Sequence, residues 1–86
     1  MKPISIMEAA LVRRLRFRAD LHSLGIRVER LSTGGVALLQ DGLCLGTWRW
    51  SPNEFTFQPE SAGRPVTAHT IMGAAALTVS ILVDEN

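Results

Sequence analysis

The sequence predicts a single α+β domain: a helix, an antiparallel sheet of three to four strands, and a second helix (α-β-β-β-(β)-α). Two observations lead to this fold class. Apolar residues recur with helical spacing up to residue 24, and after Gly25 the pattern changes to alternation with a period of two. Segments that favour turns then divide residues 26–58 into strand-length pieces. We expect one domain over residues 1–86, because chains of this length seldom divide.

The first helix is predicted over about residues 6–24. Ser5 and Glu8 match a capping box, in which each side chain bonds the backbone N–H of the other residue. Gly25 suits the left-handed conformation that ends many helices. At 100° per residue, one broad face collects the apolar side chains Met7, Ala10, Leu11, Leu15, Phe17 and Leu21.

Four strands and a second helix follow. The strands are predicted at about residues 26–31, 36–40, 43–50 and 54–58. Asp41-Gly42 is the strongest turn signal, because this pair takes the positive φ angles of a two-residue type I′ hairpin. The second helix is predicted over about residues 68–83 with Thr67 as its N-cap. Its β-branched end leaves a terminal strand as the alternative.

The basic residues are unevenly distributed. Residues 9–30 carry six basic and two acidic groups, a net charge of +4, whereas residues 31–86 have a net charge of −3. Arg14, Arg18 and His22 are spaced four residues apart, which aligns them on one flank of the predicted helix. A solvated helix flank is the simplest interpretation. Guanidinium groups also suit carboxylates and phosphates, so such a patch can attract an acidic partner.

We therefore predict a binding site for a partner protein with an acidic surface. The expected contact residues are Arg13, Arg14, Arg16, Arg18 and Arg49. Nucleic acid bound at the same arginines is the alternative, and it would give the steep salt dependence of phosphate neutralisation.

Four of the five aromatic residues lie between Trp48 and Phe57. With a turn at residues 51–54, Trp50 faces Phe55 and Trp48 faces Phe57, so all four share one face of the sheet. We expect this face to form the core, since each ring buries on the order of 150–250 Å². An exposed platform that stacks bases is the alternative.

The opposite face of the sheet is expected to mix apolar and polar side chains. The predicted members are Val36, Leu38, Gln40, Leu43, Leu45, Thr47, Arg49, Thr56 and Gln58. The second helix is apolar on nearly all sides, and one small core cannot easily cover both features. We therefore expect self-association, most simply as a homodimer, through Leu38, Leu43, Leu45, Met72 and Val79.

Side chains typical of catalysis or metal binding are not grouped. His22 and His69 lie far apart in the chain, and Cys44 falls in a predicted strand on the aromatic face, as a small buried thiol does. We predict no catalytic residue, no metal and no cofactor, so the protein is not expected to be an enzyme. The longest uncharged apolar run, residues 70–83, is shorter than the roughly 20 residues that span a bilayer. A cytoplasmic protein without membrane contact is expected.

The predicted order of helix, three strands and helix is similar to the double-stranded RNA-binding domain. Gly63-Arg64, before the alanine-rich helix, resembles the approach to that family's second helix. The family presents lysines at the start of this helix to reach phosphates across a groove. Residues 67–70 are Thr-Ala-His-Thr here, so no binding residue carries over.

The expected function is that of a non-enzymatic protein-binding module that occupies the surface of a partner. Its size and the lack of catalytic groups suit the small accessory proteins of phages and other mobile elements, such as inhibitors of host defence (anti-CRISPR-like) complexes. The alternative is a small nucleic-acid-binding protein that uses the arginine-rich first helix.

Overall fold

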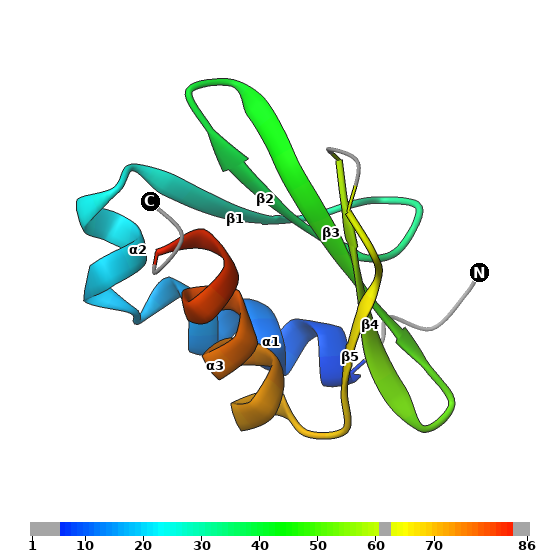
Figure 1. Cartoon of the computed structure of the whole chain (residues 1–86). Coiled ribbons are helices and arrows are strands. Elements are labelled where there is room, and N and C mark those ends of the chain that lie inside the picture. The colour runs from blue at the N-terminus through cyan, green and yellow to red at the C-terminus, as the bar shows by residue number, and fades with distance from the viewer. Residues whose placement is uncertain (1–5, 61–62, 84–86) are drawn as a thin grey trace.

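A computed structural model describes residues 6–60 and 63–83, and in these ranges three helices pack against one face of a five-stranded antiparallel sheet (Figure 1). The helices are α1 (Ile6–Arg16), α2 (Ala19–Ser23) and α3 (Ile71–Leu82). The strands are β1 (Ile26–Arg30), β2 (Val36–Gln40), β3 (Leu43–Ser51), β4 (Glu54–Pro59) and β5 (Val66–Ala68). Their order in the sheet is the order in the chain. The α+β class is confirmed, and the sheet has one strand more than predicted.

The helix predicted over residues 6–24 is interrupted at Phe17 and Arg18. Arg18 is extended, with φ −81° and ψ 114°, and the amide groups of both residues bond the carbonyl three positions back. In a straight helix Leu21 would lie about 120° around the axis from Leu15. The interruption instead turns Leu21 into the core, where it is 1% exposed. The break thus accompanies the burial of Leu21.

Two sequence expectations fail because of this interruption. Phe17, predicted on the apolar helix face, is 83% exposed. Arg14 lies on α1 and His22 on α2, so the predicted line of Arg14, Arg18 and His22 along one helix does not form. Gly25 is confirmed as the residue that ends the helical segment, with φ 71° and its N–H donating to the carbonyl of His22.

The capping box falls partly outside the described residues, since Ser5 is not among them. Glu8 is buried and accepts two backbone hydrogen bonds from the sheet. Its Oε1 accepts from the N–H of Gly35 and its Oε2 from the N–H of Trp50, both at 2.9 Å. The carboxylate thereby fastens the first turn of α1 to the start of β2 and the end of β3.

The β2–β3 hairpin contains a bulge that the sequence pattern did not reveal. Its turn is as predicted, with positive φ at Asp41 and Gly42. Leu39 pairs with Cys44 but Leu38 pairs with Gly46, which leaves Leu45 as an extra residue on β3. Because of this extra residue, the β3 partners of residues 36–38 lie one position further along β3 than in a hairpin without a bulge. The face on which each β3 side chain meets β2 is therefore exchanged in this part of the hairpin.

The bulge corrects the predicted division of the two sheet faces. Val36 pairs with Trp48 rather than Thr47, and both Val36 and Leu38 are fully buried in the core. Cys44 pairs with Leu39 on the outer face, not on the aromatic face. The outer face carries mostly small and polar side chains: Ala37, Leu39, Cys44, Thr47, Arg49, Thr56 and Gln58. The mixed apolar face expected for self-association is therefore not the one that forms.

Gly46 is required where the bulge meets the core, because a Cβ atom at this position would overlap the ring of Phe57. We expect Gly46→Ala to lower the free energy of unfolding by about 1–3 kcal/mol, since the ring must shift within a packed core. Urea unfolding measures this change. Thr47→Ala, on the outer face of the same strand, is the control and should cost less. Equal losses in the two variants would contradict this account of Gly46.

The aromatic residues form the core on the face covered by the helices, as predicted. Trp48, Phe55 and Phe57 are at most 1% exposed, and the ring centroids of Trp48 and Phe57 are 5.1 Å apart. The indole Nε1 donates to Thr78 Oγ1 on α3 at 2.8 Å. These three rings are therefore not available to stack bases.

The C-terminal segment differs from the prediction at its start. Residues 66–68 form β5, so the helix begins at Ile71 rather than at about residue 68. Its N-cap is Thr70 rather than Thr67, and Thr70 Oγ1 accepts from the N–H of Gly73 at 2.9 Å. The helix then continues to Leu82, so the alternative of a terminal strand is wrong. Each helix within the described ranges is too short or too polar to cross a membrane.

Candidate functional site

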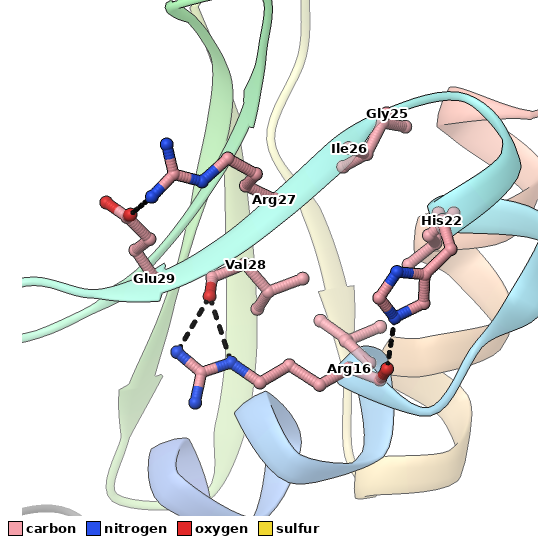
Figure 2. A pocket seen from close by; sticks show the side chains of 9 residues that line it. Arg16, His22, Gly25, Ile26, Arg27, Val28 and Glu29 are labelled. Carbon is pink, nitrogen blue, oxygen red and sulfur yellow. Dashed lines mark hydrogen bonds and ion pairs between the residues drawn. The ribbon is translucent and has the colours of Figure 1, made fainter.

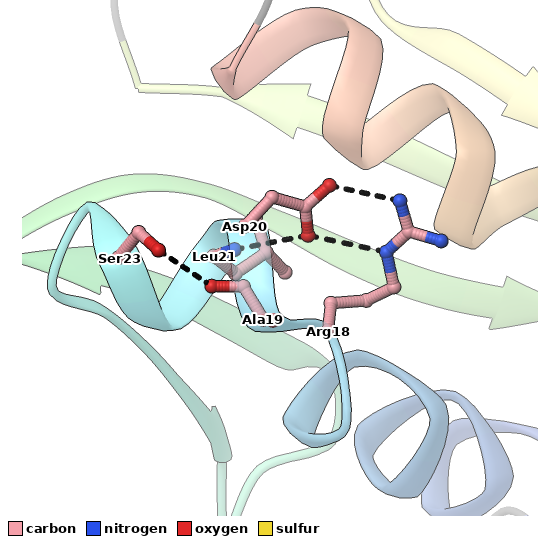
Figure 3. A network of polar contacts seen from close by, with 5 residues as sticks. All are labelled: Arg18, Ala19, Asp20, Leu21 and Ser23. Carbon is pink, nitrogen blue, oxygen red and sulfur yellow. Dashed lines mark hydrogen bonds and ion pairs between the residues drawn. The ribbon is translucent and has the colours of Figure 1, made fainter.

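The five arginines predicted to bind a partner are divided among different surfaces. Arg49 lies on the outer face of the sheet, where its Nη1 donates to the Gly34 carbonyl at 3.3 Å. Arg18 pairs with Asp20 through Nη2–Oδ2 at 2.8 Å and Nε–Oδ1 at 3.2 Å (Figure 3). The side-chain hydrogen bond from Arg18 lowers the pKa of Asp20, and the same pairing raises the pKa of Arg18. The positive charge of Arg18 is therefore compensated by Asp20.

Local hydrogen bonds also hold the short helix α2 together (Figure 3). Asp20 Oδ1 accepts from the N–H of Leu21 at 3.0 Å, and Ser23 Oγ donates to the carbonyl of Ala19 at 3.0 Å. Asp20 and Ser23 are thus engaged in contacts within or next to α2.

Arg16 joins α1 to the edge of the sheet. Its Nε and Nη2 donate to the carbonyl of Val28 at 3.2 and 3.0 Å, and its own carbonyl accepts from His22 Nε2 at 2.7 Å (Figure 2). A carbonyl is only an acceptor, so Nε2 carries a proton. Among residues 6–60 and 63–83, β1 pairs with β2 alone, and Arg16 bonds a carbonyl of this edge strand.

A surface hollow of about 380 Å³ opens between α1 and the end of β1. It is lined by Ala9, Val12, Arg13, Arg16, Phe17 and Arg30, and we call it the basic hollow. Three arginines from two elements line it together with Phe17, whose ring is exposed, and no acidic side chain is among the lining residues. The basic hollow can therefore hold a carboxylate or phosphate next to an apolar group.

A second hollow, of about 390 Å³, follows the edge of β1 and is called the edge hollow (Figure 2). Residues 25–29 line it from the strand side, and Leu15, Arg16, Leu21 and His22 line it from the helical side. Arg16 borders both hollows. Arg27 and Glu29 pair with each other at 2.6 Å and thus compensate each other's charge.

Two members of the basic hollow were missed from the sequence. Arg30 is brought to the inner side of the sheet because it shares the alternation of Ile26 and Val28. This alternation is visible in the sequence, but a charged residue at the end of a strand is normally taken to point into solvent. Phe17 was assigned to the core, and only the break after α1 turns its ring outward.

The residues predicted for self-association are not gathered on one surface. Leu38 is fully buried, and Leu45 and Val79 are half-buried. Leu43 and Met72 are exposed, but the β2–β3 turn and the first turn of α3 lie at opposite ends of the view in Figure 1. Self-association stays a prediction, which sedimentation velocity tests.

The candidate nucleophile and bases lie on separate elements. Cys44 is half-buried on β3 and its Sγ donates to the Gly46 carbonyl, whereas His22 lies on α2 and His69 is exposed just before α3. Among residues 6–60 and 63–83, no three or more His, Cys, Asp or Glu side chains group as a metal site would require. The basic hollow is thus the strongest candidate site in the described part of the chain.

Comparison with known proteins adds no relative from which a function could be transferred. No family model, no curated protein and no solved structure matches this chain.

Proposed function

We propose that this chain is a non-enzymatic protein-binding module that occupies an acidic surface of a partner protein through the basic hollow. One observation carries the proposal: Arg13 and Arg16 of α1 and Arg30 of β1 line one hollow together with Phe17, which is 83% exposed. Arginine and aromatic side chains are enriched at the energetic centres of protein interfaces. A carboxylate can pair with the guanidinium groups while an apolar neighbour packs on the ring.

Occupation of a surface is also the way in which a chain without catalytic groups would inhibit its partner. A bound domain of this size excludes other ligands from the surface that it covers. Such a protein could act as an inhibitor encoded by a phage or another mobile element. The expected compartment is the cytoplasm, because free cysteines such as Cys44 persist there.

Charge reversal at the basic hollow tests this proposal. Arg13→Glu and Arg30→Glu are each expected to weaken partner binding at least about tenfold through like-charge repulsion, and Phe17→Ala to do the same through loss of an apolar anchor. The thermal midpoint should hardly move, since exposed charges contribute less than about 1 kcal/mol. The measurement is calorimetry against a partner isolated from native lysate by pull-down and mass spectrometry.

Arg49→Glu is the matched control, because it makes the same charge change on the outer face of the sheet. If binding were lost in Arg49→Glu but retained in Arg13→Glu and Arg30→Glu, the interface would lie on the outer face and the proposal would be overturned.

Nucleic acid is the second candidate ligand, since guanidinium groups also pair with phosphates. Its binding would show a steep log–log dependence on salt, and nuclease treatment would abolish capture. A shallow slope and nuclease-resistant capture are expected for a partner protein.

A further inference from the structure

In the described part of the chain, one edge of β1 pairs with no other strand, and it lies next to the basic hollow. The Val28 carbonyl points away from β2, because it accepts from Arg16 on α1. In an antiparallel strand the N–H and C=O of one residue point to the same side, and the side alternates along the chain. The backbone groups of Ile26, Val28 and Arg30 therefore face the open edge. An edge of this kind is where an additional strand pairs.

Charge is distributed asymmetrically about this edge. On the inner side, toward α1, lie Arg13, Arg16 and Arg30, which line the basic hollow. On the outer side, Arg27 and Glu29 neutralise each other. A strand added here would present alternate side chains to the two sides. Carboxylates are favoured at every second position, toward α1, and uncharged side chains at the positions between.

We propose that the edge of β1 takes up an extended acidic segment of the partner protein as an additional strand, with its carboxylates facing Arg13, Arg16 and Arg30. This inference rests on the proposed function and specifies how the partner is held. A main-chain N–H of the segment donates to the Val28 carbonyl in place of Arg16. The released guanidinium then pairs with a carboxylate of the segment, so that neither group is left without a partner.

A second copy of this chain is the less favourable occupant of the edge. Pairing of two β1 strands would bring the arginines of one protomer beside those of the other, and like charges at close range oppose association. The charge of the edge therefore selects an acidic segment over self-pairing.

Three decapeptides of defined sequence test the inference by NMR titration of the isotope-labelled chain. The first alternates threonine and glutamate. The second has the same composition in two blocks, five glutamates followed by five threonines, so that total charge is matched without alternation. The third alternates threonine and glutamine, which keeps the strand pattern without charge.

The alternating acidic peptide is expected to bind at least about tenfold more tightly than the block peptide, because only alternation turns all its carboxylates toward the arginines while the main chain pairs with β1. It should shift the amide signals of Ile26, Val28 and Arg30 and slow their hydrogen exchange. The glutamine peptide should bind more weakly than the acidic one. Arg30→Gln should reduce the affinity for the alternating peptide severalfold while Arg49→Gln leaves it unchanged.

A backbone modification separates strand addition from charge attraction alone. Ligation at Cys44 allows the chain to be assembled with an N-methyl group on the Val28 nitrogen, which removes the outward N–H and keeps the side chain. Once its native spectrum is verified, this chain should bind both acidic peptides with equal, weak affinity.

The possible failures are distinguishable. If the two acidic peptides bind the unmodified chain equally and shift only the arginine side chains, strand addition is overturned and the acidic-surface proposal stands. If neither binds, or if the alternating peptide perturbs the outer face instead, the strand-addition inference is overturned, and the charge-reversal variants decide the acidic-surface proposal separately. A dimer that forms through β1 without peptide would identify a second copy as the occupant and overturn the inference.

Discussion

Trp48→Ala is expected to lower the free energy of unfolding by about 3–5 kcal/mol. The indole is fully buried and packs against Phe55 and Phe57, with ring centroids 6.1 and 5.1 Å away. Truncation leaves a large cavity at the centre of the sheet, where a tightly packed interior relaxes only in part. It also removes the hydrogen bond to Thr78, which joins β3 to α3.

Urea unfolding followed by circular dichroism measures this loss. Trp50→Ala is the matched control, because Trp50 lies on the same strand and the same face but is only half-buried. The Trp50 variant should lose clearly less stability. A Trp48→Ala variant that melts within about a degree of the parent would show that the aromatic face is not the core.

The aromatic core was predictable because its determinants are local. Asp41-Gly42 fixes one hairpin turn, and the spacing of Trp48, Trp50, Phe55 and Phe57 across the next places all four rings on one face. No long-range contact is needed to deduce this. The same reasoning failed one hairpin earlier, where Leu45 is an extra residue on β3 and the Phe57 ring lies against Gly46, a contact that the sequence does not reveal.

The break after α1 has a similarly non-local cause. Helical periodicity runs through residues 6–24, and the intrinsic propensities of Phe17 and Arg18 do not end a helix. The break coincides with contacts to other segments: Leu21 is buried in the core, Arg16 donates to the Val28 carbonyl, and His22 bonds back to Arg16. Contacts of this kind are not visible in a local sequence pattern.

The candidate site was predictable only to the extent that it lies on one helix. Arg13 and Arg16 follow directly from the arginine-rich segment. Arg18 was included because the nearby Asp20 was not recognised as its partner, and Arg49 because the sequence does not show which elements the two faces of the sheet contact. The alternation of β1 indicates the inner side of the sheet for Arg30, but only the packing of β1 against α1 brings it to the same hollow as Arg13 and Arg16.

Removal of the Glu8 carboxylate is expected to have the second largest effect, and it tests what holds the binding surface in place. Glu8→Ala should lower the free energy of unfolding by about 3 kcal/mol, because the buried N–H of Gly35 and the N–H of Trp50 both lose their acceptor. The loss also detaches α1 from the ends of β2 and β3. Since α1 carries Arg13 and Arg16, partner binding should weaken together with stability.

Glu8→Gln keeps the prediction testable if the alanine variant does not fold. A neutral amide has one acceptor oxygen, so it can serve one of the two N–H groups and should cost less than alanine. Hydrogen exchange at the Gly35 and Trp50 amides should be faster in the glutamine variant than in the parent, which a general loss of packing would not confine to these two positions. Glu60→Ala removes an exposed carboxylate and serves as the control, with an expected change within about 0.5 kcal/mol. If Glu8→Ala were as stable as Glu60→Ala, the carboxylate would not be what fastens α1 to the sheet.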